Sequence, residues 1–150
     1  MSEKSSPTSA LIVEDDPVFA AFTEALLMDA GCASVTAALS GADLRAALSS
    51  RTHYDLVLLD LNMPDLDGLA AMRLLAEHDF AGQIALVSGA QTAILDAAAN
   101  LARLLQLNLA GTLIEPLRPG DLGDLLGKTL PASASASRGS GQVKREVSVQ

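Results

Sequence analysis

The sequence has very little aromatic mass and only one cysteine. Its 150 residues include three Phe, one Tyr and no Trp, although 49% are hydrophobic. This length is enough for one domain with a real core. The core must be built from Ala, Leu, Val and Ile, which suits helices packed closely on a sheet. Cys32 has no partner thiol for an internal disulfide, so we expect a buried small side chain rather than a redox centre.

Long hydrophobic runs and positive charge are also scarce. No run approaches the roughly 18 apolar residues of a membrane span, and MSEKSSPTSA at the start has no hydrophobic targeting core. We therefore expect a cytoplasmic protein that binds no membrane. The net charge is −8, and because the last twenty residues carry three bases and one acid, residues 1–130 hold −10. Such a surface repels phosphates, which argues against nucleic acid as a partner.

The composition changes at Pro131. The stretch ASASASRGSG is small, polar and of low complexity, which is typical of a flexible segment. We expect a flexible N-terminus over residues 1–8, one domain over 9–130 and a flexible tail over 131–150. Alternating Val147 and Val149 leave a second interpretation of the tail open, in which it adds a strand to the sheet edge of another molecule.

Short β-like runs alternate with helix-like runs between the two ends. The predicted strands are ALIVE (10–14), ASVTAA (33–38), YDLVLLD (54–60), QIALVS (83–88) and GTLIE (111–115). The predicted helices lie within residues 17–31, 40–50, 68–78, 92–107 and 119–130. Five strands that alternate with five helices predict an α/β fold with a parallel sheet covered on both faces.

Several helix ends carry recognisable signals. Asp16 followed by Pro17 predicts an N-cap before a proline at the first helical position. Gly31 stands where a helix C-terminus is expected, and Ser40 with Asp43 resembles a capping box. The residues expected on the inner face of the first helix are Phe19, Phe22, Leu26 and Leu27.

Acidic and hydroxyl side chains follow the predicted strands. Glu14 and Asp15 come after the first strand, Asp60 ends the third, and Ser88 and Glu115 end the fourth and fifth. In an open parallel sheet these strand ends face one crevice. Two unit charges about 4 Å apart repel by roughly 4 kcal/mol at an effective dielectric near 20. A hard cation relieves that repulsion, and oxygen ligands with retained waters suit Mg²⁺.

Three stretches together, ALIVEDDP, DLVLLDLNMPDLDG and LVSGA, resemble the receiver domain of bacterial two-component response regulators. The resemblance covers about residues 8–130. It implies a flavodoxin-like, doubly wound sheet of five parallel strands in the order 2-1-3-4-5 with five helices. It also implies a phosphoacceptor that catalyses only its own phosphorylation and dephosphorylation, not an enzyme of another class.

The resemblance assigns roles to individual residues. Asp60 matches the residue that a sensor histidine kinase phosphorylates, and Ser88 matches the hydroxyl that contacts the phosphoryl group. Glu14, Asp15 and Asp60 match the ligands of Mg²⁺, together with the backbone carbonyl of Asn62. A single-domain regulator of this kind would act through protein contacts, either as a homodimer or on a downstream phosphotransfer or effector protein.

Two positions depart from the family pattern. Glu115 stands where receivers carry a lysine before Pro116, and Thr112 stands at the aromatic switch position. The lysine normally makes a charge-assisted hydrogen bond worth about 1.5–3 kcal/mol, so its loss predicts phosphorylation weakened about ten- to hundredfold. Glu115 adds repulsion unless its side chain turns away or a cation enters, and Arg118 is the nearest basic residue.

Other interpretations remain. The chain could be an interaction module that Glu115 holds in one state regardless of phosphorylation. An aspartate-nucleophile phosphatase of the haloacid dehalogenase type needs an acid at residue 62, where Asn62 cannot transfer a proton. An EF-hand loop fails because Pro64 and Ala71 occupy ligand positions. The residues expected in caps, turns or on the surface are Asp16, Asp65, Asp67, His53 and His78.

Overall fold

A computed structural model describes residues 8–50, 53–63, 67–89 and 92–128 of the chain. The flexible N-terminus predicted over residues 1–8 lies outside this range apart from Thr8, and so does the tail predicted over 131–150. Asp65, predicted as a turn residue, lies outside it as well. These expectations stay predictions.

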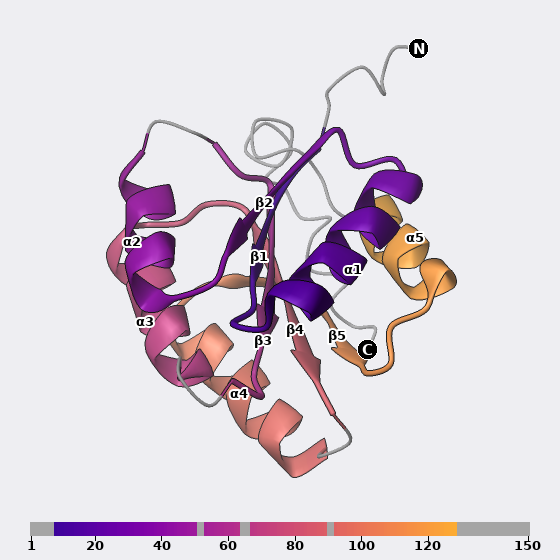
Figure 1. Cartoon of the computed structure of the whole chain (residues 1–150). Coiled ribbons are helices and arrows are strands. Elements are labelled where there is room, and N and C mark those ends of the chain that lie inside the picture. Colours follow the sequence, from indigo (N-terminus) through magenta and orange to yellow (C-terminus); the bar gives the residue numbers. More distant parts are fainter. Residues whose placement is uncertain (1–7, 51–52, 64–66, 90–91, 129–150) are drawn as a thin grey trace.

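Ten elements alternate along the chain (Figure 1). The strands are β1 (Ser9–Val13), β2 (Ser34–Ala38), β3 (Leu56–Asp60), β4 (Gln83–Ser88) and β5 (Asn108–Ile114). The helices are α1 (Pro17–Asp29), α2 (Gly41–Ser49), α3 (Gly68–Glu77), α4 (Thr92–Leu104) and α5 (Pro119–Lys128). The sequence located every element, with boundaries that shift by at most a few residues.

The five strands form one parallel sheet in the order β2-β1-β3-β4-β5. Figure 1 shows α1 and α5 side by side on one face, while α2, α3 and α4 cover the other. The predicted doubly wound fold and strand order are therefore confirmed. In such a sheet all carboxyl ends of the strands lie at one edge, which is where sites form.

The central strands bury side chains on both faces of the sheet. Along β1, Leu11 and Val13 belong to the core under α2, α3 and α4, whereas Ala10 and Ile12 belong to the core under α1 and α5. Full burial of one Leu or Ile side chain contributes about 1.5–3 kcal/mol. These two cores hold the strand ends in fixed positions at the edge of the sheet.

The predicted helix ends are present. The carboxylate of Asp16 accepts hydrogen bonds from the amides of Val18 and Phe19, at 2.9 and 3.4 Å. The hydroxyl of Ser40 accepts from the amide of Asp43 at 3.1 Å and begins α2. Gly31 follows α1 with a φ of 110°, in a region that side chains with a Cβ rarely adopt.

The predicted inner face of α1 is wrong in part. The residues of α1 that are buried are Ala20, Thr23 and Leu27. Phe22 is 48% exposed, and its ring lies 6.2 Å from that of Phe19. Position 22 is rotated about 100° around the helix from the buried position 23. The large aromatic side chain therefore remains at the margin of the contact.

Three other predictions concern Cys32, the two histidines and the ends of the strands. Cys32 is buried, and its thiol donates to the carbonyl oxygens of Thr8 and Ser34. His53 and His78 are exposed, as expected for surface residues. The first and fifth strands end one residue earlier than predicted, so that Glu14 and Glu115 lie just beyond the sheet.

Candidate functional site

Asp60 is the last residue of β3 and lies at the carboxyl edge of the sheet. Its side chain is only 6% exposed. One carboxylate oxygen, Oδ1, accepts a 2.8 Å hydrogen bond from the amide of Asn62. The amide of Leu61 donates to the carbonyl oxygen of Val87 at 2.8 Å and holds the turn against β4. The turn therefore fixes the orientation of the Asp60 carboxylate.

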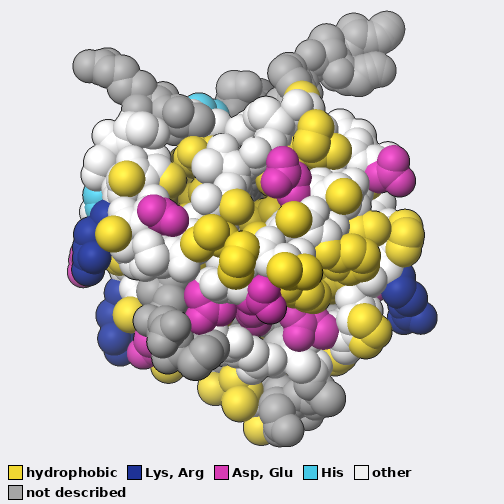
Figure 2. All heavy atoms as spheres, in the orientation of Figure 1, with side chains coloured by type: hydrophobic (Ala, Val, Ile, Leu, Met, Phe, Trp, Pro, Cys, Tyr) yellow, Lys and Arg dark blue, Asp and Glu magenta, His cyan; other side chains and the backbone are white. Residues whose placement is uncertain are grey.

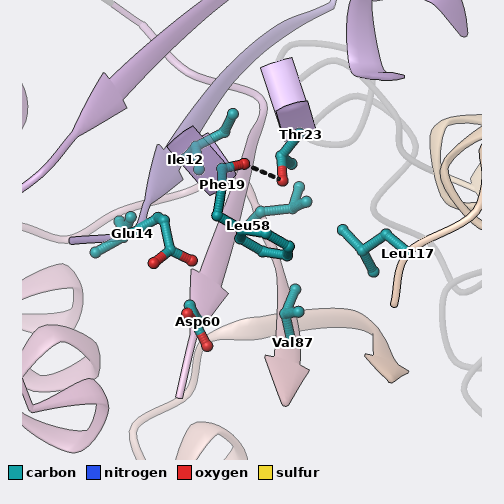
Figure 3. Close-up of a pocket in the computed structure, with 9 residues that line it drawn as sticks. Ile12, Glu14, Phe19, Thr23, Leu58, Asp60, Val87 and Leu117 are labelled. Atoms are coloured by element: carbon teal, nitrogen blue, oxygen red, sulfur yellow. Dashed lines mark hydrogen bonds between the residues drawn. The ribbon is translucent and has the colours of Figure 1, made fainter. Parts of the chain in front are cut away.

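Glu14 directly follows β1 and is even more buried, at 4% exposure. Its Oε2 accepts a 3.0 Å hydrogen bond from the amide of Asp16, whereas its Oε1 has no hydrogen-bond partner. Figure 3 shows the carboxylates of Glu14 and Asp60 next to each other in front of an apolar wall. Two ionised carboxylates only accept hydrogen bonds, so either one of them is protonated or a cation lies between them.

Glu115 completes a group of three carboxylates. It directly follows β5, its peptide bond to Pro116 is cis, and its amide donates to the carbonyl oxygen of Ser88 at 2.8 Å. One carboxylate oxygen each from Glu14, Asp60 and Glu115 lie within 4.8 Å of one another. We call these three residues the acidic trio. The side chain of Glu115 therefore turns toward the site and not away from it.

No basic side chain neutralises Glu115 among the described residues that follow it. Arg118, the nearest base along the chain, lies 3.9 Å from the carboxylate of Asp121 through its Nε and is 79% exposed. In Figure 2, acidic side chains gather across the middle of the visible face, while the basic side chains lie at its margins. Among the ion pairs of the described residues, none joins an arginine or lysine to a carboxylate of the acidic trio.

The surroundings of the acidic trio oppose full ionisation. Burial, above all, raises the pKa of Glu14 from 4.5 to about 8, and the adjacent carboxylate of Asp60 and the charge of Asp15 add to the effect. Burial and the charge of Asp60 also raise the pKa of Glu115. At neutral pH the acidic trio therefore retains a proton unless a cation replaces it.

An apolar cavity explains why burial is the largest of these effects. A space of about 10 Å³ lies beside Glu14 and Asp60 (Figure 3). Its other lining residues are Ile12, Val13, Phe19, Thr23, Leu58, Val87 and Leu117. The one hydroxyl among them, on Thr23, already donates to the carbonyl oxygen of Phe19 at 3.0 Å. The wall therefore supplies no hydrogen bond to the carboxylates.

Ser88 ends β4 and is fully buried. Its hydroxyl has no hydrogen-bond partner. The next residue, Gly89, lies close to Asn62, because a Cβ at Gly89 would approach the Nδ2 of Asn62 to 3.2 Å. The loops after β3 and β4 therefore meet beside Asp60, where an unpartnered hydroxyl is available to a ligand.

The glycine of the DLVLLDLNMPDLDG stretch has a packing reason. Gly68 begins α3 and is buried, and a Cβ there would lie 2.9 Å from Cδ2 of Leu61 and 3.3 Å from its Cα. A side chain at this position would require Leu61 to shift, so glycine lets the start of α3 approach the residue that follows Asp60 closely. Asp67 caps this helix by accepting from the amide of Leu69 at 2.9 Å.

The structure does not bring every predicted acid together. Asp16 caps α1, as the sequence predicted. Asp15 is half-buried and raises the pKa of Glu14 by its charge, but its carboxylate is not part of the acidic trio. Glu115, which the sequence placed at the site without a ligand role, is the third member of the acidic trio. The signals available in the sequence were its place at the end of the fifth predicted strand and directly before Pro116.

The residues present fit a hard divalent cation. Three carboxylates converge, and the buried Oε1 of Glu14 has no hydrogen-bond partner. Oxygen-only ligand sets suit Mg²⁺ or Ca²⁺, with metal–oxygen distances of about 2.1 to 2.5 Å. A cation would therefore satisfy the oxygen that the protein leaves unpaired.

The doubly wound five-stranded sheet with an acidic pocket at its carboxyl edge indicates a receiver-type α/β domain. Comparison with known proteins identifies the family. The model of the response regulator receiver domain matches residues 10–126. The chain belongs to this family.

The chain is similar to individual regulatory proteins. TorR, the TorCAD operon transcriptional regulatory protein of Escherichia coli K12, is 43% identical over 84 residues, which are 55% of this chain and 35% of TorR. The chain thus matches little more than a third of TorR. A response regulator from Colwellia psychrerythraea superposes with a TM-score of 0.69 and 29% identity, over 89% of this chain and 100% of that one.

A third relative carries a metal. The receiver domain of a sensor histidine kinase from Pseudomonas aeruginosa PAO1 has a magnesium ion in its active-site cleft. It shares 26% identity with this chain at a TM-score of 0.62, over 82% of this chain and 97% of that domain.

Family membership settles the general role. The chain is a receiver domain of two-component signalling, a phosphoacceptor module rather than a classical enzyme. Receiver domains take phosphoryl groups from histidine kinases. None of the helices in the described part of the chain has the length and apolar character that a membrane crossing requires.

Proposed function

We propose that Asp60 accepts a phosphoryl group from a sensor histidine kinase and that the signal leaves through protein contacts. The observation that supports this most is the state of the Asp60 carboxylate. It is buried, one oxygen is held by the amide of Asn62, and it lies next to the unpartnered oxygen of Glu14. A nucleophile needs such a fixed orientation toward the reacting phosphorus.

The hydrogen bond from Asn62 distinguishes the two oxygens of Asp60. Since Oδ1 accepts from that amide at 2.8 Å, Oδ2 is the oxygen that attacks. A bond forms between Oδ2 and phosphorus, and the bond from phosphorus to the imidazole nitrogen of the kinase breaks. The electron pair of that bond returns to the imidazole.

Four groups would hold Mg²⁺ in this proposal: the carboxylates of Glu14, Asp15 and Asp60 and the backbone carbonyl of Asn62. The ion supplies positive charge that offsets the charge of the incoming phosphoryl group. Burial of Glu14 and Asp60 removes competing water, which strengthens that interaction. Because Glu14 must lose its proton to become a ligand, cation binding and deprotonation are coupled.

Ser88 would report the phosphoryl group to the rest of the domain. Its hydroxyl is buried and free to donate to a phosphoryl oxygen. A phosphoryl group adds about −1.5 to −2 charge and three acceptors. Movement of Ser88 toward it would carry along the loop that leads into α4. Thr112, exposed on β5, lacks the ring with which receivers otherwise signal, so the output must use this loop or α4.

Residues 9–130 are the proposed receiver unit. We propose a homodimer or a downstream phosphotransfer or effector protein as the recipient of the signal. The charge of the described domain favours a protein recipient over nucleic acid, since residues 1–130 hold −10.

A second function is favoured by one observation, the inward position of Glu115. A carboxylate within 4.8 Å of Asp60 opposes the arrival of a phosphoryl group. If that opposition prevails, the chain is an interaction module whose state does not depend on phosphorylation.

Labelling with acetyl phosphate tests the proposal. The purified chain is incubated with and without Mg²⁺, and the adduct is measured by intact mass. We expect a Mg²⁺-dependent phosphoryl adduct that disappears in Asp60→Asn. Asp124→Asn is the matched control, because Asp124 is an exposed carboxylate on α5 outside the acidic trio. If the wild type gains no adduct but Glu115→Lys does, the interaction module is the better description.

A further inference from the structure

We propose that Glu115 is itself a ligand of the divalent cation, so that this receiver binds the ion between three carboxylates and releases Glu115 when Asp60 is phosphorylated. The first half concerns the unphosphorylated chain alone. The second half rests on the proposed function, since it requires that Asp60 accept a phosphoryl group.

The oxygens of the acidic trio lie close together. Oxygens from Glu14, Asp60 and Glu115 lie within 4.8 Å of one another. Ligands on opposite sides of a cation lie about 4.2 Å apart for Mg²⁺ and about 4.8 Å apart for Ca²⁺, from metal–oxygen distances of about 2.1 and 2.4 Å. Because only one pair of ligands can lie opposite each other and the others lie closer together, small rotations of the side chains would bring all three carboxylates to one ion.

One oxygen of Glu14 lacks a hydrogen-bond partner. The Oε1 of Glu14 is buried, has no hydrogen-bond partner, and belongs to a carboxylate that points toward Asp60 (Figure 3). A buried carboxyl oxygen without a hydrogen-bond partner is costly. The missing partner is an observation separate from the clustering of acids. It indicates that a positively charged group belongs beside Oε1 of Glu14.

The charge of the acidic trio favours a divalent cation over a proton. A single proton can join two of the carboxylates but leaves the acidic trio with about −2. Arg118 does not reduce this charge, because it contacts Asp121 instead. A divalent cation neutralises two charges at once and accepts oxygens from three sides. It therefore satisfies the acidic trio better than a proton does.

Glu115 also has a fixed origin. Its amide is bound to the carbonyl oxygen of Ser88, and its peptide bond leads into Pro116, so that the backbone has little freedom to carry the side chain away. The carboxylate can still rotate about its side-chain bonds. A phosphoryl group on Asp60 would bring about −1.5 to −2 charge to the same space. The Glu115 carboxylate must then leave the ion.

Calorimetric titration of the full chain with Mg²⁺, and separately with Mn²⁺, tests the ligand role. We expect Glu115→Gln, which keeps the size of the side chain, to lower the affinity for each ion at least about tenfold, since loss of even an outer-shell partner costs about 10–100-fold. Asp124→Asn removes an exposed carboxylate and should leave the affinity unchanged. Equal affinities in the wild type and Glu115→Gln would overturn the inference.

A second readout separates a ligand from a residue that merely supports the fold. At saturating Mg²⁺, Glu115→Gln should accept phosphate from acetyl phosphate faster than the wild type, although it binds the cation more weakly. A damaged fold would lower both quantities, and that outcome also contradicts the inference.

The two proposals can fail separately. Cation affinity that depends on Glu115, without an adduct in any variant, would remove the phosphoacceptor role and leave the ligand role. A Mg²⁺-dependent adduct on Asp60, with cation affinity that is the same in Glu115→Gln, would leave the phosphoacceptor role and remove the ligand role.

Discussion

The amide of Glu115 donates a 2.8 Å hydrogen bond to the carbonyl oxygen of Ser88. This bond joins the residue after β5 to the last residue of β4 through main-chain atoms only. The backbone at position 115 is therefore placed beside the site whatever side chain it carries. What the side chain contributes, a negative or a positive charge, then decides how easily a phosphoryl group enters.

Glu115→Lys should raise the rate of phosphorylation by acetyl phosphate about ten- to hundredfold, because a charge-assisted hydrogen bond worth about 1.5–3 kcal/mol replaces repulsion. The measurement is the initial rate of adduct formation by intact mass at saturating Mg²⁺. Asp124→Lys makes the same change of charge on the exposed side of α5 and serves as the control. Equal acceleration in both variants would mean that only the overall charge matters.

The stability of the metal-free protein should depend on pH in an unusual direction. The pKa of Glu14 rises from 4.5 to about 8 in the folded protein, chiefly through burial. Between these values the folded state binds more protons than the unfolded state, so the free energy of unfolding falls as pH rises. The full contribution of Glu14 is present below about pH 4.5 and is lost as pH passes about 8.

Urea unfolding in the presence of a chelator, followed by circular dichroism, measures this trend. The negative groups that face Glu14 are Asp15, Asp60 and Glu115. Glu14→Gln should remove most of the pH dependence, because the amide does not titrate. Excess Mg²⁺ should also weaken it, since the cation binds the deprotonated form. A wild type whose stability rises steadily over this interval would contradict the prediction.

Asp16 and Asp15 should separate into different roles although they are neighbours. Asp16→Ala removes the cap on the amides of Val18 and Phe19 and should lower the free energy of unfolding by about 0.5–2 kcal/mol, with little change in Mg²⁺ affinity. Asp15→Ala should weaken Mg²⁺ binding and change the free energy of unfolding little. Unfolding curves and calorimetric titrations of both variants provide the comparison, and exchanged effects would show that the two roles are assigned the wrong way round.

The fold could be predicted from the sequence because its signals are local. Alternation of strand-like and helix-like runs requires no knowledge of distant contacts, and the caps at Asp16, Ser40 and Gly31 involve only nearby backbone. The carboxyl edge of a parallel sheet then places Asp60 and Glu14 together by topology alone. The order of the strands came from the family resemblance.

The direction of individual side chains could not be predicted in the same way. Whether Glu115 turns inward depends on the hydrogen bond of its amide to Ser88 and on the balance of charge with the carboxylates of Glu14 and Asp60, which lie at the ends of two other strands. Phe22 was assigned to the inner face of α1, but the buried residues of that helix are Ala20, Thr23 and Leu27. Both features depend on contacts between elements far apart in the chain.

Glu115 should also change which cation the site prefers. Mg²⁺ requires near-octahedral geometry and keeps several waters, whereas Ca²⁺ accepts six to eight oxygens in flexible geometry. A third carboxylate beside Glu14 and Asp60 replaces water with a protein oxygen, which favours Ca²⁺. We expect Glu115→Gln to lower the ratio of Ca²⁺ affinity to Mg²⁺ affinity roughly severalfold, in addition to weakening both.

Titration of the wild type and Glu115→Gln with each ion at one pH and one ionic strength gives this ratio. The pH should lie above about 8, so that protonation of Glu14 does not distort the comparison. Asp16→Asn is the informative companion, because it removes a neighbouring charge outside the acidic trio, while asparagine can still cap α1. If Asp16→Asn changes the ratio as much as Glu115→Gln does, the preference reflects the total negative charge near Asp60. If only Glu115→Gln changes it, the additional oxygen of Glu115 sets the coordination.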